Sequence, residues 1–143
     1  MSQDQMGEDP TAYFERAYQD YEQWAAEQRT EPPEFTQATR RSALGAAGAA
    51  AGLADNGGLM GGLVENDWHG SPDLIFTHDA VAAFRFLGFD DAATLIETAA
   101  DAYPRMRPGG FEELSAADEQ WWEQLDEQWF ALEITERLDQ LAQ

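Results

Sequence analysis

Apolar residues recur along the chain at three- and four-residue steps, the spacing that puts side chains on one face of a helix. The first such stretch follows Asp9-Pro10, a capping residue before a proline at the first helical position. Its apolar positions are Tyr13, Phe14, Ala17, Tyr18, Tyr21, Trp24 and Ala25. Pro32-Pro33 ends the stretch, because proline cannot continue a helix. The pattern predicts an amphipathic first helix with acids on its outer side.

Small residues dominate the next predicted helix, which runs from about Thr36 to Ala54. Glycine lowers helix stability, so this Ala- and Gly-rich helix should persist only by tight packing. Asn56-Gly57-Gly58 predicts its end. The stretch from Leu59 to Asn66 is ambiguous and allows a short helix, and Asp67 to Pro72 is typical of a loop.

Two more helices follow from the same spacing. The first runs from Leu74 to Leu87 and ends at Gly88, and Asp90 or Asp91 is predicted to cap the second. The apolar face of the second comprises Ala92, Leu95, Ile96, Ala99 and Tyr103. A loop is predicted over Pro104, Pro108 and Gly109-Gly110.

The last predicted helix begins at Ser115, with Asp118 three residues on as a variant capping box. Its apolar positions Trp121, Trp122, Leu125, Trp129, Leu132 and Leu138 keep helical spacing to the C-terminus. No alternating run predicts a strand. We therefore expect an all-α fold, a single compact domain over residues 1–143 with five to six mostly antiparallel helices. Residues 1–8 are expected to form a flexible N-terminus.

Composition agrees with a folded domain. The chain has 143 residues, of which 43% are hydrophobic, including 5 Trp, 4 Tyr and 8 Phe, unlike a disordered acidic tail. It has no cysteine, which excludes disulfides, thiolate catalysis and zinc–thiolate sites. The polar, acidic start, from Met1 to Asp20, does not resemble a signal peptide, and we expect a cytoplasmic protein.

The net charge of the chain is the strongest indication of what the protein binds. The chain carries 28 acidic residues against 8 arginines, a net charge of −20. Such a protein repels nucleic acid and anionic membranes and attracts basic proteins, so direct nucleic-acid binding and membrane binding are not expected. The alternative is that the acids serve solubility or adaptation to high salt.

Several motifs have competing interpretations. Arg40-Arg41 before the Ala/Gly run resembles a twin-arginine export signal, but a packing helix whose arginines reach nearby carboxylates fits better. His69 and His78 lie nine residues apart, which is not a metal-ligand spacing, so we expect a loop histidine and a helix-cap histidine. The Trp stripe of the last helix is predicted to be core, with Trp121 or Trp122 near the surface.

No motif favours an enzyme. Carboxylate pairs such as Glu112-Glu113 and Asp126-Glu127 are typical of solvated runs, whereas an acid catalyst needs an apolar cleft. The glycine pairs lack the lysine and the preceding strand of a phosphate-binding loop. We expect no catalysis, no metal and no cofactor.

Three segments form a further pattern: the turn Asn56-Gly57-Gly58-Leu59, the helix over residues 80–89 with its Leu87-Gly88 step, and the helix over residues 92–99 that begins with small residues. Together they resemble a bacterial family of DNA-mimic proteins typified by DMP-nineteen. An acidic last helix follows in both. The resemblance covers roughly residues 40 to 140, and the family's usual Gln and aromatic residue are replaced by Gly61-Gly62. It implies an all-helical fold whose acidic surface occupies the DNA site of a DNA-binding protein.

The predicted partner is thus a basic or DNA-binding protein, such as a transcriptional regulator. The acidic residues expected to contact it are Glu119, Glu123, Asp126 and Glu127 on the last helix, with Asp20 and Glu27 on the first helix as a second row. Residues 119, 123 and 127 form an i, i+4 row with a rise of about 6 Å per step. The alternative is a salt-adapted interaction or immunity-type protein whose partner binds an apolar patch. The sequence leaves a homodimer open.

Overall fold

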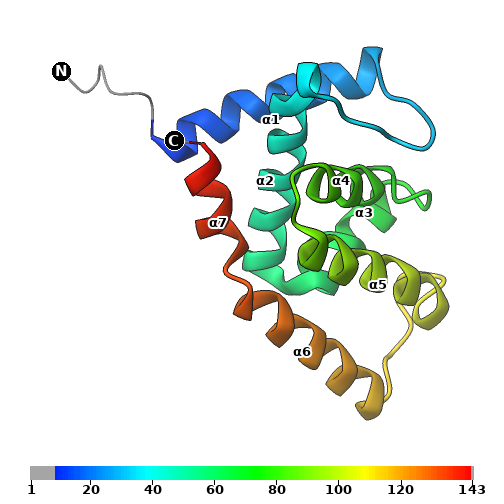
Figure 1. Ribbon diagram of the computed structural model, residues 1–143. Helices are drawn as coiled ribbons and strands as arrows, with labels where there is room; N and C mark the ends of the chain where they lie inside the picture. Colours follow the sequence, from blue (N-terminus) through cyan, green and yellow to red (C-terminus); the bar gives the residue numbers. More distant parts are fainter. Residues whose placement is uncertain (1–8, 143) are drawn as a thin grey trace.

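The computed structural model describes residues 9–142 as helices joined by turns and loops (Figure 1). Five longer helices are α1 (Pro10–Glu27), α2 (Arg40–Gly57), α4 (Ile75–Phe86), α5 (Asp90–Met106) and α6 (Ala116–Ala131). Shorter elements are the 3-10 turn η1 (Gln37–Thr39), the π-helix η2 (Gly58–Val64), α3 (Glu65–Gly70) and α7 (Ile134–Leu141). Residues 9–142 contain no strand, which confirms the prediction of a single all-helical domain. The segment 1–8, predicted to be flexible, lies outside the described residues.

α1 begins where the sequence predicts. The Asp9 carboxylate accepts the Ala12 N–H at 2.9 Å, and Pro10 occupies the first helical position. This cap pairs one of the amide groups that the helix leaves unbonded at its start. On its inner face, the Trp24 ring stacks on Phe35 from the loop after α1, with ring centroids 4.3 Å apart.

α1 and α2 cross at Gly45. A Cβ atom there would lie 2.1 Å from the Ala17 carbonyl oxygen, so only glycine allows this approach. Figure 1 shows α2 running across α1 and then through the middle of the molecule. Most alanines of α2, including Ala54, are fully buried, and so is Leu44. The small residues of α2 thus pack closely, as predicted from their composition.

The ambiguous stretch after α2 is a π-helix followed by α3. Gly58 starts it with a φ of +83°, and a Cβ on Gly62 would lie 2.1 Å from the Leu53 carbonyl oxygen. The prediction of a loop from Asp67 to Pro72 is wrong over most of this range, because α3 extends to Gly70. The Asp67 carboxylate ties α3 to α4 by accepting the N–H and the hydroxyl of Thr77, at 2.8 and 2.7 Å.

α4 and α5 are the two helices predicted after the loop, but both ends of α5 differ from the prediction. Gly88 separates them with a φ of +88°. The predicted cap at Asp90 or Asp91 is wrong, since Phe89 holds the cap position and both acids lie inside α5. α5 also continues through Pro104, where a loop was predicted. The Arg107 N–H closes the last turn on the carbonyl of the buried Tyr103, at 2.8 Å.

A buried carboxylate joins the α1 region to α4. Asp79 is 0% exposed and accepts the Tyr21 hydroxyl at 2.7 Å and the Arg29 Nε–H at 2.8 Å. Burial raises the pKa of Asp79, and the hydrogen bonds and the Arg29 charge act in the opposite direction. The buried Asp79 carboxylate is therefore stabilised by hydrogen-bond donors from α1 and from the loop after it.

The last predicted helix starts correctly but is wrong in its length. The Ser115 hydroxyl accepts the Asp118 N–H at 3.0 Å, as predicted. However, α6 ends at Ala131 and α7 begins at Ile134, with Glu133 between them at a φ of +51°. None of the helices in residues 9–142 has the length and apolar character needed to span a bilayer.

Asp55, at the end of α2, holds the corner between α6 and α7. Its carboxylate accepts the Trp129 Nε1–H at 2.9 Å and also the Thr135 hydroxyl. Trp129 is 1% exposed and lies edge-on against Phe84, with ring centroids 6.2 Å apart. One carboxylate thus fixes the direction of both C-terminal helices.

Candidate interaction surface

α6 presents an acidic row on its outer side. Glu119, Glu123 and Glu127 are all exposed, and their i, i+4 spacing lines them up along one face of the helix. Within residues 9–142, no ion pair involves any of the three. The opposite face packs Trp122, Leu125 and Trp129 into the core. As predicted, the Trp stripe is mainly core, and Trp121 is the half-exposed member of its pair.

Asp126 does not belong to this row. Its carboxylate is half-buried and accepts the Leu59 N–H at 2.8 Å, at the start of η2. Burial raises the pKa of Asp126, and the bond from Leu59 acts in the opposite direction. The predicted solvated pair Asp126-Glu127 therefore divides into an internal contact and an exposed charge.

The predicted residues on α1 lie apart from α6. Asp20 forms an ion pair with Arg41, whose Nε lies 3.0 Å from the carboxylate, and both side chains are 45% exposed. This pair matches the expectation that the paired arginines reach nearby carboxylates. Glu27 is exposed at the last position of α1. Figure 1 shows α1 and α6 at opposite ends of the molecule, so Asp20 and Glu27 do not extend the α6 row.

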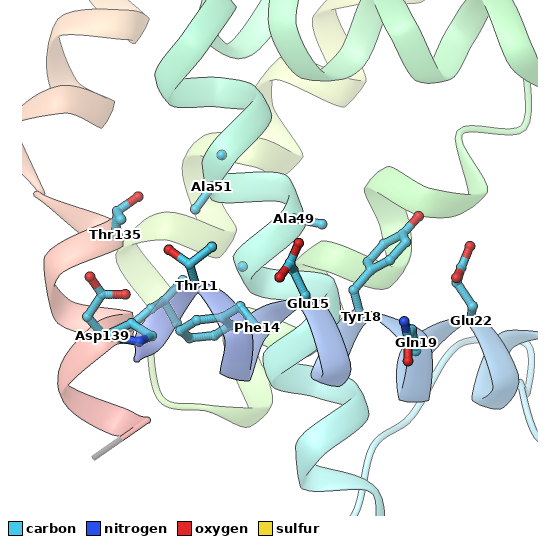
Figure 2. A pocket seen from close by; sticks show the side chains of 14 residues that line it. Thr11, Phe14, Glu15, Tyr18, Gln19, Glu22, Ala49, Ala51, Thr135 and Asp139 are labelled. Carbon is cyan, nitrogen blue, oxygen red and sulfur yellow. The ribbon is translucent and has the colours of Figure 1, made fainter. Parts of the chain in front are cut away.

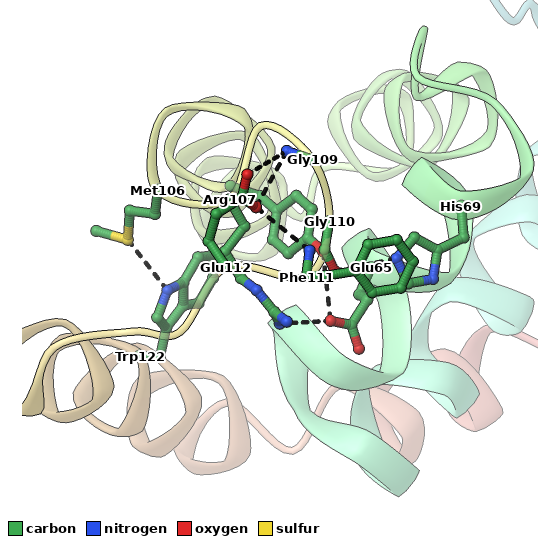
Figure 3. A network of polar contacts seen from close by, with 10 residues as sticks. Glu65, His69, Met106, Arg107, Gly109, Gly110, Phe111, Glu112 and Trp122 are labelled. Atoms are coloured by element: carbon green, nitrogen blue, oxygen red, sulfur yellow. Dashed lines mark hydrogen bonds and ion pairs between the residues drawn. The ribbon is translucent and has the colours of Figure 1, made fainter.

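A polar network sets where α6 begins (Figure 3). Arg107 lies 2.6 Å from Glu65, and the Tyr103 hydroxyl donates to the same carboxylate at 3.3 Å. Burial, followed by the Glu65 charge, raises the pKa of Tyr103 to about 12. Further along the loop, the Glu112 carboxylate accepts the Gly109 N–H at 2.8 Å. These contacts fasten the loop before α6 to α3 and so fix the position of the acidic row.

The same network engages His69. This histidine lies in α3 rather than in the predicted loop, with Nε2 3.2 Å from the Gly110 carbonyl oxygen and its ring stacked on the exposed Phe111 at 5.1 Å. His78 is exposed in the first turn of α4. Among the described residues, no group of three or more His, Asp or Glu side chains is arranged to hold a metal ion.

Residues 111–143 contain a single arginine, Arg137, and it forms an ion pair. Arg137 of α7 lies 3.0 Å from Asp91 of α5, and its guanidinium stands over the Phe89 ring at 4.5 Å. This contact fastens α7 to the start of α5. Because Arg137 is paired with Asp91, it does not neutralise a carboxylate of the α6 row.

An open groove lies between α1, α2 and α7 (Figure 2). Its volume is about 660 Å³. Phe14 and Tyr18 of α1 line it and are only half-buried, although the sequence pattern assigned them to the core face of the first helix. The apolar face of α1 is wider than its contact with α2, and that excess width was the signal for a groove.

Residues 9–142 thus form an acidic, all-helical structure with a carboxylate row that has no ion pair among these residues, and with an apolar groove beside α1. A family model described as DMP19-like protein matches residues 34–143. Because this match covers most of the chain, the protein belongs to the DMP19-like family. No curated protein and no solved structure matches it. The match begins after α1, so it includes the acidic row but only part of the groove.

Proposed function

We propose that this protein is an acidic protein-binding domain that acts as a DNA mimic. In this proposal the α6 row occupies the DNA-binding surface of a basic partner such as a transcriptional regulator. The observation that carries it is the exposed row of Glu119, Glu123 and Glu127, none of which forms an ion pair within the described range 9–142. The row rises by about 6 Å per step. That is similar to the phosphate spacing along a DNA strand, whose axial rise is about 3.4 Å plus the helical path.

The rest of α6 supports this role. Its inner face is anchored by buried tryptophans and its ends by Ser115 and Asp55, so the carboxylates stand on a rigid element. A rigid display limits the ordering cost of binding. Membership of the DMP19-like family adds to this support through the resemblance to DNA mimics. The proposal assigns the protein no catalysis, cofactor or direct contact with nucleic acid, and places it in the cytoplasm.

The test compares two variants with equal changes of charge. A partner captured from native lysate at low salt is purified, and its affinity is measured for the parent and for Glu119→Gln/Glu123→Gln/Glu127→Gln. Affinity should fall about tenfold or more, and its salt dependence should flatten, because exposed charges are screened as the Debye length shortens. DNA should displace the parent from the partner.

The matched control is Glu15→Gln/Glu22→Gln/Asp139→Asn, which removes three carboxylates beside the groove. It should keep most of the affinity and the salt slope. If the α6 variant binds as tightly as the parent, or if DNA and the protein bind the partner together, the mimicry proposal is wrong.

A further inference from the structure

We infer that the groove between α1, α2 and α7 is a docking site for a basic amphipathic helix of another protein. One wall is the α1 face from Pro10 to Glu22, a length of about 18 Å, or roughly three helical turns. The floor is formed by Gly48, Ala49 and Gly52 of α2. Nothing lies within 4 Å of a Cβ built on Gly52, so the floor is open there.

The groove continues past Tyr18 into a second hollow of about 410 Å³. This hollow shares Tyr18 and the three small residues of α2, and adds Leu53 and Phe76. Leu53 is 37% exposed and so adds accessible apolar surface to this second hollow. The two hollows together form one apolar channel along α1, long enough for several turns of a helix.

Carboxylates border this channel. Glu15 and Glu22 are exposed along the α1 edge, and Asp139 stands on α7 (Figure 2). In the part of the chain that the structure describes, the residues that line the two hollows include no arginine and no histidine. Burial and then the Glu22 charge raise the pKa of the Tyr18 hydroxyl. The negative charge of Glu22 at the rim therefore affects Tyr18 inside the groove.

These features select the occupant. An amphipathic helix places apolar side chains at i, i+3, i+4 and i+7 into a hydrophobic groove. Lysines or arginines beside that stripe would meet Glu15, Glu22 and Asp139 at the rim. An acidic or neutral helix would bring no charge to compensate them.

This chain does not supply such a helix. Its basic residues are 8 arginines scattered through a chain of net charge −20, and residues 1–8 carry two acids and no base. A second copy would bring like charges to the rim, which costs energy. The docking inference does not depend on DNA mimicry, because the α6 row contributes nothing to the groove.

The experiment is a fluorescence anisotropy titration with a labelled synthetic Leu–Lys peptide. The peptide has about 14 residues, with leucines at i, i+3, i+4 and i+7. A scrambled peptide of equal composition spreads the leucines around the helix. The intact protein should bind the amphipathic peptide about tenfold more tightly than the scrambled one.

Gly52→Gln places a polar side chain in the channel without changing the charge. It suits a helix better than glycine, so the fold should hold. Peptide affinity should fall about tenfold or more. The control Gly61→Gln alters another open glycine, in η2 and outside the groove, and should bind like the parent. Glu15→Gln/Glu22→Gln should weaken binding more than Glu119→Gln/Glu123→Gln does.

Several results would overturn this inference. They are no measurable binding of the peptide, equal binding of the scrambled peptide, unchanged affinity for Gly52→Gln, or a larger loss from the α6 pair than from the rim pair. Light scattering adds a further outcome. If the parent is a dimer and Gly52→Gln is a monomer, a second copy occupies the groove and the inference is wrong.

Discussion

α1 and α6 are amphipathic helices of 18 and 16 residues, and each buries three side chains. Their outer faces differ because their neighbours differ. On α1, Asp20 is paired with Arg41, and apolar rings remain half-exposed beside α2 and α7. On α6 three large apolar side chains are buried, Phe130 is 49% exposed, and the glutamates of the row have no ion pair in the described part of the chain.

The comparison teaches that acidic sequence does not by itself define an acidic interaction surface. Asp126 was predicted to share the acidic face of the last helix, and Asp20 was predicted to belong to a second acidic row on the first helix. One is partly neutralised by an arginine and the other caps a buried amide. Only carboxylates that lack both kinds of partner display their full charge.

The largest expected effect is loss of the α6 anchor. Trp129→Ala should lower the free energy of unfolding by about 3–5 kcal/mol, because it empties a buried site and leaves Asp55 without its indole donor. Urea denaturation measures this. Trp121→Ala, at the half-exposed neighbouring position, should cost clearly less. Equal losses would mean that α6 is not anchored through Trp129.

The next effect concerns the α1 region. Arg29→Gln removes the guanidinium beside the buried Asp79 and should cost about 3 kcal/mol near neutral pH. Without Arg29, the folded pKa of Asp79 should rise further above its unfolded value. The native variant then binds a proton that the unfolded chain does not, so its deficit should shrink as pH falls through that folded pKa.

Denaturation of this variant at several pH values tests the effect. The control is Arg105→Gln, whose Nε–H reaches only the Asp101 carbonyl oxygen at the surface. A deficit that is constant with pH would show that the Asp79 charge is not its cause.

A smaller effect separates Asp126 from its exposed neighbour. Asp126→Ala leaves the buried Leu59 N–H without its acceptor and should cost about 1–3 kcal/mol. Asp126→Asn keeps an acceptor oxygen and should recover part of the loss. Thermal unfolding measures both, and Glu127→Ala serves as the exposed control. An Asp126→Ala protein as stable as the control would return Asp126 to the acidic row.

The smallest expected effect is on the row itself. Glu119→Gln/Glu123→Gln/Glu127→Gln should change stability by no more than about 0.5 kcal/mol, because these side chains are exposed and form no ion pair with any other described residue. Relief of like-charge repulsion along the helix favours a slight gain. Urea denaturation at low and high salt checks this. A large loss would mean that the row holds the fold together, which would weaken its assignment as a binding surface.

Local signals predicted the starts of α1 and α6 and the end of α4. Asp9-Pro10 and Ser115 act through residues three positions away, and Gly88 acts through its own backbone, so the sequence contains the whole interaction. The break at Glu133 was missed because apolar spacing continues across it. It coincides with contacts from Asp55, which lies far away in the chain.

The candidate surface was predictable in part for the same reason. Helical periodicity places Glu119, Glu123 and Glu127 on one face, and the structure keeps all three exposed. Periodicity carries no information on whether another element covers a face. The contact of Asp126 with η2 therefore became visible only in the fold, and the open side of α1 had only the width of its apolar face as a signal in the sequence.

The pairing of Asp79 has a consequence for the ancestry of the chain. Asp79 lies within the family region 34–143, whereas Tyr21 and Arg29 precede it. A chain that keeps Asp79 but lacks Tyr21 and Arg29 would lose both of these side-chain partners of the carboxylate. Asp79 and α1 should therefore have been inherited together. Relatives without α1 are expected to carry a neutral residue at the equivalent of position 79, which sequences of such relatives can test.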